Sequence, residues 1–426
     1  MSDLAKKLEG LSPEKRALLE RRLREKAKGR SSAAAEKPRR PSEESPPASR
    51  RLPAPDPLRP GAQGRLEFSL FYFSSDESRR ATNKHRLLLE GARFADRHGF
   101  DAVWTPERHF HPFGGLYPNP SLASAALAMV TERIHLRAGS VVMPLHRPLR
   151  VAEEWALVDN LSGGRAGIAF ASGWHAHDFA FFPQHYKERR QVMAQGVEQV
   201  RRLWRGESVP VLDGRGNEVE VKIYPEPLQA ELPFWLTAGG SEHTFRKAGE
   251  VGANLLTNLL GQSVEGVARR VEIYRSSLAE HGHDPDHGRV TLMLHSFLGE
   301  SVEEVRRVVR DPFCQYLRSF GGLLDNLAQS MGVGTHGEGL SEDDIDSVLS
   351  FAFDRYFNNS GLFGTPESCL ELAQRLRDIG VDEVACLVDF GVDDDRVLAS
   401  LEPLDALRRK LQPEALAAAE GRGAGS

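Results

Sequence analysis

The chain has 426 residues, of which 40% are hydrophobic and 27% charged, so it can bury the core of one large domain with extensions. No run of about 18 apolar residues is present and the N-terminus is polar, so we expect neither a membrane span nor a secretory signal. The formal net charge is −5, with +7 on residues 1–64 and −12 on the remainder. Because the basic arm lacks interleaved aromatic residues and the body is acidic, nucleic acid is not expected as a partner.

The first 64 residues divide into a helical segment and a linker. In residues 1–29, Ser12 and Pro13 fit an N-cap and a first helical residue ahead of a leucine stripe. This segment is either a solvated tail or a docking element, because two short helices cannot bury a core alone. Residues 30–64 contain eight prolines among Ser, Ala and Arg, which predicts an extended, disordered linker.

From residue 66 onward, apolar strands alternate with amphipathic helices. Eight strands separated by helices predict an α/β fold of the (β/α)8 type, the TIM barrel, over residues 65–412. We expect residues 413–426 to form a flexible tail, and residues 217–224 to form one strand of an inserted hairpin. The eight expected barrel strands are residues 66–73, 100–105, 134–143, 165–171, 234–238, 253–258, 290–298 and 383–390.

The unit at residues 134–174 is the centre of this pattern. Two buried strands flank a helix that Pro148 can begin and Gly163 can end. Parallel pairing with a right-handed crossover follows from that order. The polar residues then gather after the carboxyl ends of the strands, where α/β folds place their chemistry.

The longest insertion separates the seventh and eighth barrel strands. Its middle, residues 330–341, is glycine-rich and polar. A GxGxxG match at residues 332–337 has no preceding strand, so it does not indicate a dinucleotide site. We expect residues 325–345 to form a lid over the barrel mouth, since long loops of this kind are often functional.

The turn after the fifth strand is the best candidate for a phosphate site. The strand ends at Ala238, Gly239, Gly240 and Ser241 follow, and Thr244 is expected to open the next helix. Glycines let backbone N–H groups approach an anion at a helix N-terminus. The alternative is an ordinary turn in which Ser241 or Thr244 only caps the helix.

Titratable residues cluster in the loop after the second strand. Glu107, Arg108, His109 and His111 fall where the active loops of a barrel lie. Each histidine could instead make a structural hydrogen bond. A metal site built on His109-x-His111 and His175-x-His177 is a weaker alternative, because Asp389 alone ends a strand as a suitable carboxylate. Three cysteines lack metal-like spacing and fit reduced side chains of a cytoplasmic protein: Cys314, Cys369 and Cys386.

Five motifs in order resemble the bacterial-luciferase-like flavin monooxygenases, in the subgroup of natural-product gene clusters. They cover about residues 66–410: PERHFHPFGGLYPNPSLASAAL, RAGSVVMPLHRPLRVAEEWALVDNLSGGR, ASGWHAHDF, GGSEHTFRKAGEVGANLLTNLLGQ and GTPESCLELAQRLRDIGVDEVACLVDFG. The resemblance implies a barrel that binds the cofactor phosphate after strand five, and a non-proline cis peptide beneath the flavin ring. The implied cofactor-binding residues are Gly139, Ser140, Ser172, Trp174, Gly239, Gly240, Ser241 and Thr244, with Met143 also in the flavin pocket.

Two positions differ from the pattern of luciferase itself. The luciferase α-subunit has arginine where this chain has Ser172, and its catalytic histidine position holds Arg108 here. The second histidine of the luciferase pair is retained as His109. On this resemblance, His109 beside Glu107 is the candidate for proton transfer or for a hydrogen bond to the peroxide, and Arg108 for holding an anion or carbonyl oxygen. The changed histidine position argues against light emission but not against oxygen chemistry.

The sequence is thus read as a monooxygenase that uses reduced FMN (FMNH2) and O2, with a separate flavin reductase as partner. Residues 11–26, LSPEKRALLERRLREK, resemble segments near module starts of nonribosomal peptide and polyketide synthases, which implies a carrier-bound substrate. A homodimer is one option for the assembly. The alternatives are a deazaflavin-dependent oxidoreductase of the same superfamily, a non-catalytic assembly-line partner and, last, a metal-dependent hydrolase.

Overall fold

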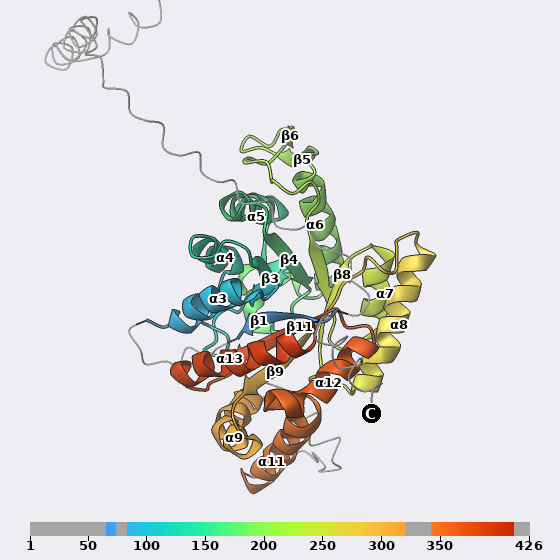
Figure 1. The fold of residues 1–426 in the computed structure, drawn as a ribbon. Helices are drawn as coiled ribbons and strands as arrows, with labels where there is room; N and C mark the ends of the chain where they lie inside the picture. Colours follow the sequence, from blue (N-terminus) through green and yellow to red (C-terminus); the bar gives the residue numbers. More distant parts are fainter. Residues whose placement is uncertain (1–64, 74–82, 320–341, 413–426) are drawn as a thin grey trace, which may run out of the picture. The chain divides into compact units, whose positions relative to one another are not determined.

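Eight parallel strands close into a barrel in the computed structural model, which describes residues 65–73, 83–319 and 342–412 (Figure 1). The predicted docking segment, linker and C-terminal tail lie outside the described residues. So do residues 325–341 of the predicted lid, whereas its last residues, 342–345, begin a helix. Among the described residues, no helix is both long enough and apolar enough to cross a membrane.

The barrel strands follow one another in sequence order, and the last pairs with the first. Neighbouring strands pair in the parallel orientation throughout this ring. All eight predicted strands are present, and each end lies within two residues of its expected position, so the expected TIM barrel is confirmed. The strands are β1 (Glu67–Tyr72), β2 (Ala102–Thr105), β3 (His135–Val142), β4 (Ala166–Ala171), β7 (Phe234–Thr237), β8 (Asn254–Asn258), β9 (Val290–Leu298) and β11 (Glu383–Asp389).

Helices cover the outside of the barrel, and α13 lies beside α3 because the sheet is closed (Figure 1). The helices are α3 (Arg86–His98), α4 (Pro120–Ala128), α5 (Pro148–Ser162), α6 (Arg189–Trp204), α7 (Glu242–Glu250), α8 (Val264–Glu280), α9 (Val302–Ser319), α11 (Glu342–Asn359), α12 (Pro366–Asp378) and α13 (Asp394–Lys410). Three short 3-10 turns lie near the barrel mouth: η2 (Met143–Leu145), η3 (Ala176–Phe181) and η4 (Pro183–His185).

Local signals set the ends of α5 as expected. Pro148 is its first residue, and Gly163 ends it in the left-handed conformation, with φ at 72°. The start of α7 differs from the prediction, since the helix begins at Glu242 and Ser241 is its N-cap. Thr244 therefore lies inside the first turn, because an N-cap residue precedes the first helical residue.

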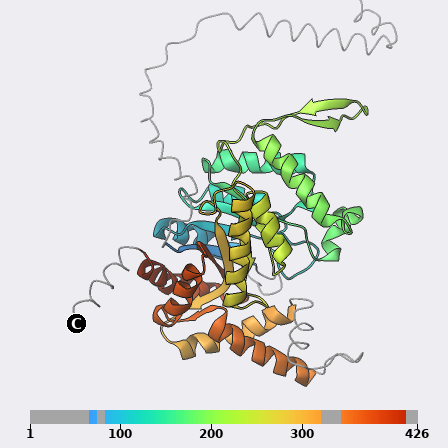
Figure 2. The same cartoon turned by 90° about the vertical axis from the view of Figure 1, so that its right-hand side faces the viewer.

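Two elements add to the barrel. The predicted hairpin is β5 (Val209–Leu212) paired with β6 (Glu218–Val221), and it extends away from the barrel beyond α6 (Figure 2). The third added strand, β10 (Leu362–Gly364), pairs with the end of β9 and was not predicted. Three residues are too few to show strand periodicity, so only the pairing with β9 identifies this strand.

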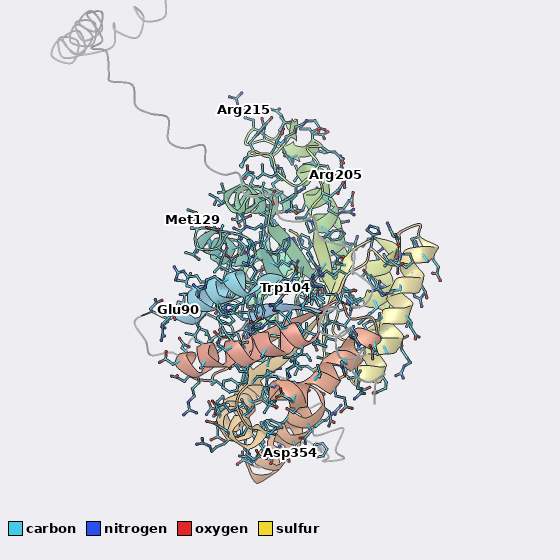
Figure 3. The ribbon with its side chains drawn as sticks, in the orientation of Figure 1. Glu90, Trp104, Met129, Arg205, Arg215 and Asp354 are labelled. Atoms are coloured by element: carbon cyan, nitrogen blue, oxygen red, sulfur yellow. The ribbon has the colours of Figure 1, made fainter. Side chains whose placement is uncertain are left out.

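A buried charge cluster fills the amino-terminal end of the barrel. Glu383 accepts hydrogen bonds from Arg137 at 2.9 Å and from Arg289 at 3.0 Å. The guanidinium of Arg137 lies between the rings of Trp104 and Trp235, at 5.1 and 4.7 Å. Trp104, in the middle of the barrel (Figure 3), also donates to Glu383 at 2.9 Å. These hydrogen bonds therefore connect barrel strands that are distant from one another in the sequence.

Candidate active site

A cavity of about 190 Å³ lies at the carboxyl ends of the barrel strands. Its walls combine apolar rings and chains with a few polar groups and exposed backbone. The lining residues are Phe71, Phe73, Pro106, Glu107, Gly139, Ser140, Val142, Ala171, Gly173, Trp174, Thr237, Leu256, Thr257, Asn258, Leu260, Met293, Tyr316 and Leu387. An apolar hollow with few convergent polar groups is the usual form of a cofactor or substrate site.

Glu107 is the only carboxylate among these lining residues, and its side chain is fully buried. One oxygen, Oε1, faces Nε2 of His109 at 2.8 Å and Nε2 of His146 at 2.6 Å. The other, Oε2, accepts from the backbone N–H of Val142 at 2.6 Å. Burial raises the pKa of Glu107, but these hydrogen bonds outweigh it, so the pKa lies below its usual value. The carboxylate is therefore held in one orientation and charged.

The other two expected catalytic residues, Arg108 and His109, are not among the lining residues. His109 does not line the cavity, and its imidazole packs edge-on against Phe181 at 4.8 Å. Arg108 is buried and forms an ion pair with Asp178, which follows β4. His111 accepts from the backbone N–H of Phe113 at 3.1 Å. Of the expected catalytic residues, only Glu107 is thus among the lining residues, with its carboxylate buried in the cavity wall.

The wall formed by β3 has the backbone geometry that the resemblance implied. The peptide bond between Gly139 and Ser140 is cis. A Cβ atom at Gly139 would lie 2.6 Å from the ring of Phe71, so no side chain fits there. The hydroxyl of Ser140 lies 2.6 Å from that of Thr237 on β7. Backbone and hydroxyl groups therefore face the cavity together on this side.

The segment after β4, the strand that pairs with β3, forms the next part of the wall. Trp174 lines the cavity and is 51% exposed, and its ring lies 3.3 Å from that of His175. Ser172 lies between two lining residues, Ala171 and Gly173, but does not line the cavity itself. Burial, with the charge of Arg108 adding, lowers the pKa of His175 to about 4. His175 is therefore neutral at pH 7.

The glycine turn, residues 239–241, follows Thr237 and Ala238 along the chain. A Cβ atom at Gly239 would meet nothing within 4 Å, so its backbone is open to an approaching group. The side chain of Ser241, the N-cap of α7, makes no capping hydrogen bond. The alternative in which Ser241 caps the helix through its side chain is thus not what the structure has. The first N–H groups of a helix have no intrahelical acceptor, which suits an anion here.

Gln262, after β8, ties this turn to the cavity wall. Its side-chain nitrogen donates to the carbonyl oxygens of Gly239 and, at 2.8 Å, of Asn258, which lines the cavity. Arg270 donates to its side-chain oxygen at 3.1 Å. The positive charge of Arg270 is therefore connected to the glycine turn through Gln262, by two successive hydrogen bonds.

The sequence model of the family described as luciferase-like monooxygenase matches residues 66–383. The chain belongs to this family. The expectation of a flavin-dependent monooxygenase of the luciferase-like type is thereby confirmed.

Two relatives in sequence are named as monooxygenases. A "flavin-dependent trigonelline monooxygenase, oxygenase component" of Acinetobacter baylyi is 26% identical over 346 residues, covering 79% of this chain and 93% of that protein. A "4-hydroxyprotoasukamycin monooxygenase" of Streptomyces nodosus subsp. asukaensis is 29% identical over 244 residues, covering 55% and 65%.

Solved structures share the fold. The monooxygenase RslO1 from Streptomyces bottropensis has a TM-score of 0.64 at 23% identity, covering 80% of this chain and 98% of that one. The oxygenating constituent of 3,6-diketocamphane monooxygenase from Pseudomonas putida, in complex with FMN, has a TM-score of 0.62 at 18% identity, covering 82% and 97%. An F420-dependent secondary alcohol dehydrogenase has a TM-score of 0.57 at 19% identity, covering 80% and 99%.

Sequence reasoning missed several groups of this luciferase-like monooxygenase. Gln262 lay within a quoted motif without a role, and Asp178 and His146 were not recognised as partners of the active loop. Met143 was expected in the flavin pocket, but it lines a separate groove outside the barrel. A polar residue next to each strand end was the only signal for these contacts, and it does not say which partner each would meet.

Proposed function

We propose that this chain is the oxygenase of a two-component system, using reduced FMN from a separate reductase and O2 to insert one oxygen atom into a natural-product intermediate. A relative's designation as an oxygenase component supports the separate reductase. The asukamycin-type name of another relative supports a natural-product substrate. The structural neighbour crystallised with FMN supports that flavin.

The observation that carries the proposal is the cavity beside the glycine turn. Its residues fit the two ends of FMN: flat apolar groups such as Phe71 and Trp174 suit a ring system, and the Gly239–Ser241 backbone suits a phosphate. We assign the phosphate to Gly239, Gly240, Ser241 and Thr244, with Gln262 holding the turn and Ser172 nearby.

Residues of the chain then have separate tasks. Bound reduced FMN supplies the activation of O2. Trp174 and the β3 wall around Gly139 and Ser140 orient the ring and keep water out. Glu107, backed by His109, holds or moves a proton at its carboxylate. Arg108, engaged by Asp178, keeps the loop in place.

The cofactor prediction compares FMN with riboflavin. FMN should bind at least about tenfold more tightly, because riboflavin lacks the phosphate, and Gly240→Asp should abolish that preference by repulsion at short range. Binding is measured by quenching of flavin fluorescence, with Gly214→Asp in the exposed hairpin turn as control. Equal affinities of wild-type enzyme for FMN and riboflavin would contradict the phosphate assignment.

Turnover assays distinguish oxygenation with reduced FMN from hydride transfer with a reduced deazaflavin. Wild-type enzyme with FMNH2 and O2 should add the mass of one oxygen atom to candidate acyl thioesters, as measured by mass spectrometry. An F420-dependent enzyme shares the fold, so a reduced deazaflavin is tested in parallel. Turnover with the deazaflavin alone would favour hydride transfer, and no turnover with either would favour a non-catalytic partner.

We also propose that residues 1–29 dock the enzyme onto a synthase through the linker at residues 30–64. The leucine stripe and the +7 charge of residues 1–64 support a mixed apolar and electrostatic contact with an acidic carrier surface. The barrel domain, residues 65–412, would then perform the chemistry independently of this arm.

Deleting residues 1–60 should leave FMN binding and thermal stability unchanged. Activity on a free thioester should persist, whereas activity on the carrier-bound substrate should fall about tenfold or more at low salt, where charge attraction is strongest. Steady-state assays on the two substrates measure this difference. If the truncated enzyme works as well as the full chain on the carrier-bound substrate at low enzyme concentration, the segment is only a solvated tail. An unfolded truncation would refute the domain boundary.

A further inference from the structure

His146 lies between two hollows of the molecule. On the inner side its ring meets the buried carboxylate of Glu107, a residue that lines the barrel cavity. On the outer side it lines a groove of about 640 Å³ between the β3–α5 connection and α6. The groove residues are Met143, His146, Arg147, Pro148, His185, Val192, Ala194, Gln195, Gly196, Glu198 and Gln199.

The contact between the two residues is direct and well ordered. Nε2 of His146 lies 2.6 Å from Oε1 of Glu107, while the backbone N–H of Val142 fixes the other carboxylate oxygen. The side chain of His146 is 27% exposed and that of Glu107 fully buried. One hydrogen bond therefore spans the wall between the cavity and the groove.

The charges around His146 favour its protonated form. Burial lowers the pKa of His146, but the hydrogen bond and charge of Glu107, with the charge of Glu154 on α5, outweigh this effect and raise it. Arg147 precedes α5, and His185 and Glu198 face the same groove from η4 and α6. At the groove, His146 therefore holds a proton more readily than a free imidazole does, beside the carboxylate of Glu107.

We propose that His146 supplies protons from the outer groove to the barrel cavity through Glu107. The inference rests on the proposed function, whose balance, written for the anionic form of reduced FMN, is RH + FMNH⁻ + O2 + H⁺ → ROH + FMN + H2O. One proton from solution is consumed in each turnover, in a cavity that must exclude bulk water. The proton passes from Nε2 of His146 to Oε1 of Glu107 and on to an acceptor in the cavity. The neutral imidazole then regains a proton from water in the groove.

His146 acts here through Glu107 and is a positioning residue, so the test needs a variant that keeps its hydrogen bond. His146→Gln retains an N–H donor for Glu107 but cannot titrate. Its turnover should fall about 10- to 100-fold, within the range of one lost proton-transfer group, with FMN affinity unchanged. Added imidazole, which the open groove can admit, should restore part of the rate. His185→Gln, in the same groove but bonded to the carbonyl of Pro144, is the control.

The pH profile separates this role from a structural one. Wild-type turnover should decline as pH rises through the raised pKa of His146, and His146→Gln should lack that step. A variant with wild-type turnover would overturn the proposal. So would a loss that imidazole does not rescue and that keeps the wild-type pH step.

A second measurement needs no cofactor. In ¹⁵N NMR titrations of the cofactor-free protein, Glu107→Gln should lower the pKa of His146, and an unchanged pKa would overturn the pairing. The two proposals fail differently: the proposed function fails when wild-type enzyme gives no oxygenated product. The relay fails when wild-type enzyme works and His146→Gln works equally well.

Discussion

Replacing Glu107 by glutamine should lower oxygenation turnover by about 100-fold or more, because the only carboxylate among the cavity-lining residues would be lost. The amide is nearly isosteric, so the hollow keeps its shape and FMN affinity should hold. Turnover and flavin binding are measured on the same preparation. Since the pKa of Glu107 lies below its usual value, the wild-type group is charged across the neutral range, and the loss should persist there.

A second variant and a control test whether this loss of turnover reflects chemistry or folding. His109→Ala should also lower turnover about 100-fold while the melting temperature stays within a few degrees, because His109 acts on the buried carboxylate from behind. Glu90→Gln, on the outer face of α3 (Figure 3), is the matched control and should behave as wild type. Normal turnover in Glu107→Gln, or a His109→Ala protein that does not fold, would mean that this loop is structural.

Glu383→Gln should reduce the free energy of unfolding by about 3 kcal/mol or more, because two buried arginines would lose their shared counter-charge. Asp101, which lies 2.8 and 2.7 Å from Arg137 and Arg289, would remain as their ion-pair partner. Denaturant unfolding followed by circular dichroism measures the change. Glu265→Gln is the control: its ion pair with Arg375 is exposed, so the free energy of unfolding should stay close to that of the wild type.

The same cluster predicts how stability depends on pH. Burial raises the pKa values of Asp101 and Glu383, but Arg137 and Arg289 outweigh it and hold both below their usual values. The folded state therefore binds fewer protons than the unfolded state in acid. The stabilisation is complete above the ordinary carboxyl pKa and is lost as pH falls below it. Glu383→Gln should flatten this dependence, and an unchanged acid slope would show that the cluster does not control it.

The alternation of apolar segments with amphipathic helices was enough to predict the barrel strands, because most residues of each strand are buried or nearly so. Local chemistry likewise located the helix at Pro148–Ser162, where proline and glycine act at the helix ends through their own backbone preferences. The prediction that Thr244 opens the helix after strand five was less accurate. Ser241 and Thr244 are both acceptable N-cap residues, and only the folded turn selects Ser241. The strand Leu362–Gly364 was missed because three residues show no strand periodicity, so only the pairing with β9 identifies it.

The sequence by itself determined the barrel, the family and the loops that carry polar residues, because these depend on short-range patterns and on motifs in fixed order. Only the tertiary structure decided which polar residues meet. It put Glu107 in the cavity with His109 behind it, paired Arg108 with Asp178, and joined His146 to Glu107 across 39 residues of sequence. The physical reason is that hydrogen bonds and ion pairs act over a few ångströms in space, and closing the barrel brings distant strand ends within that range.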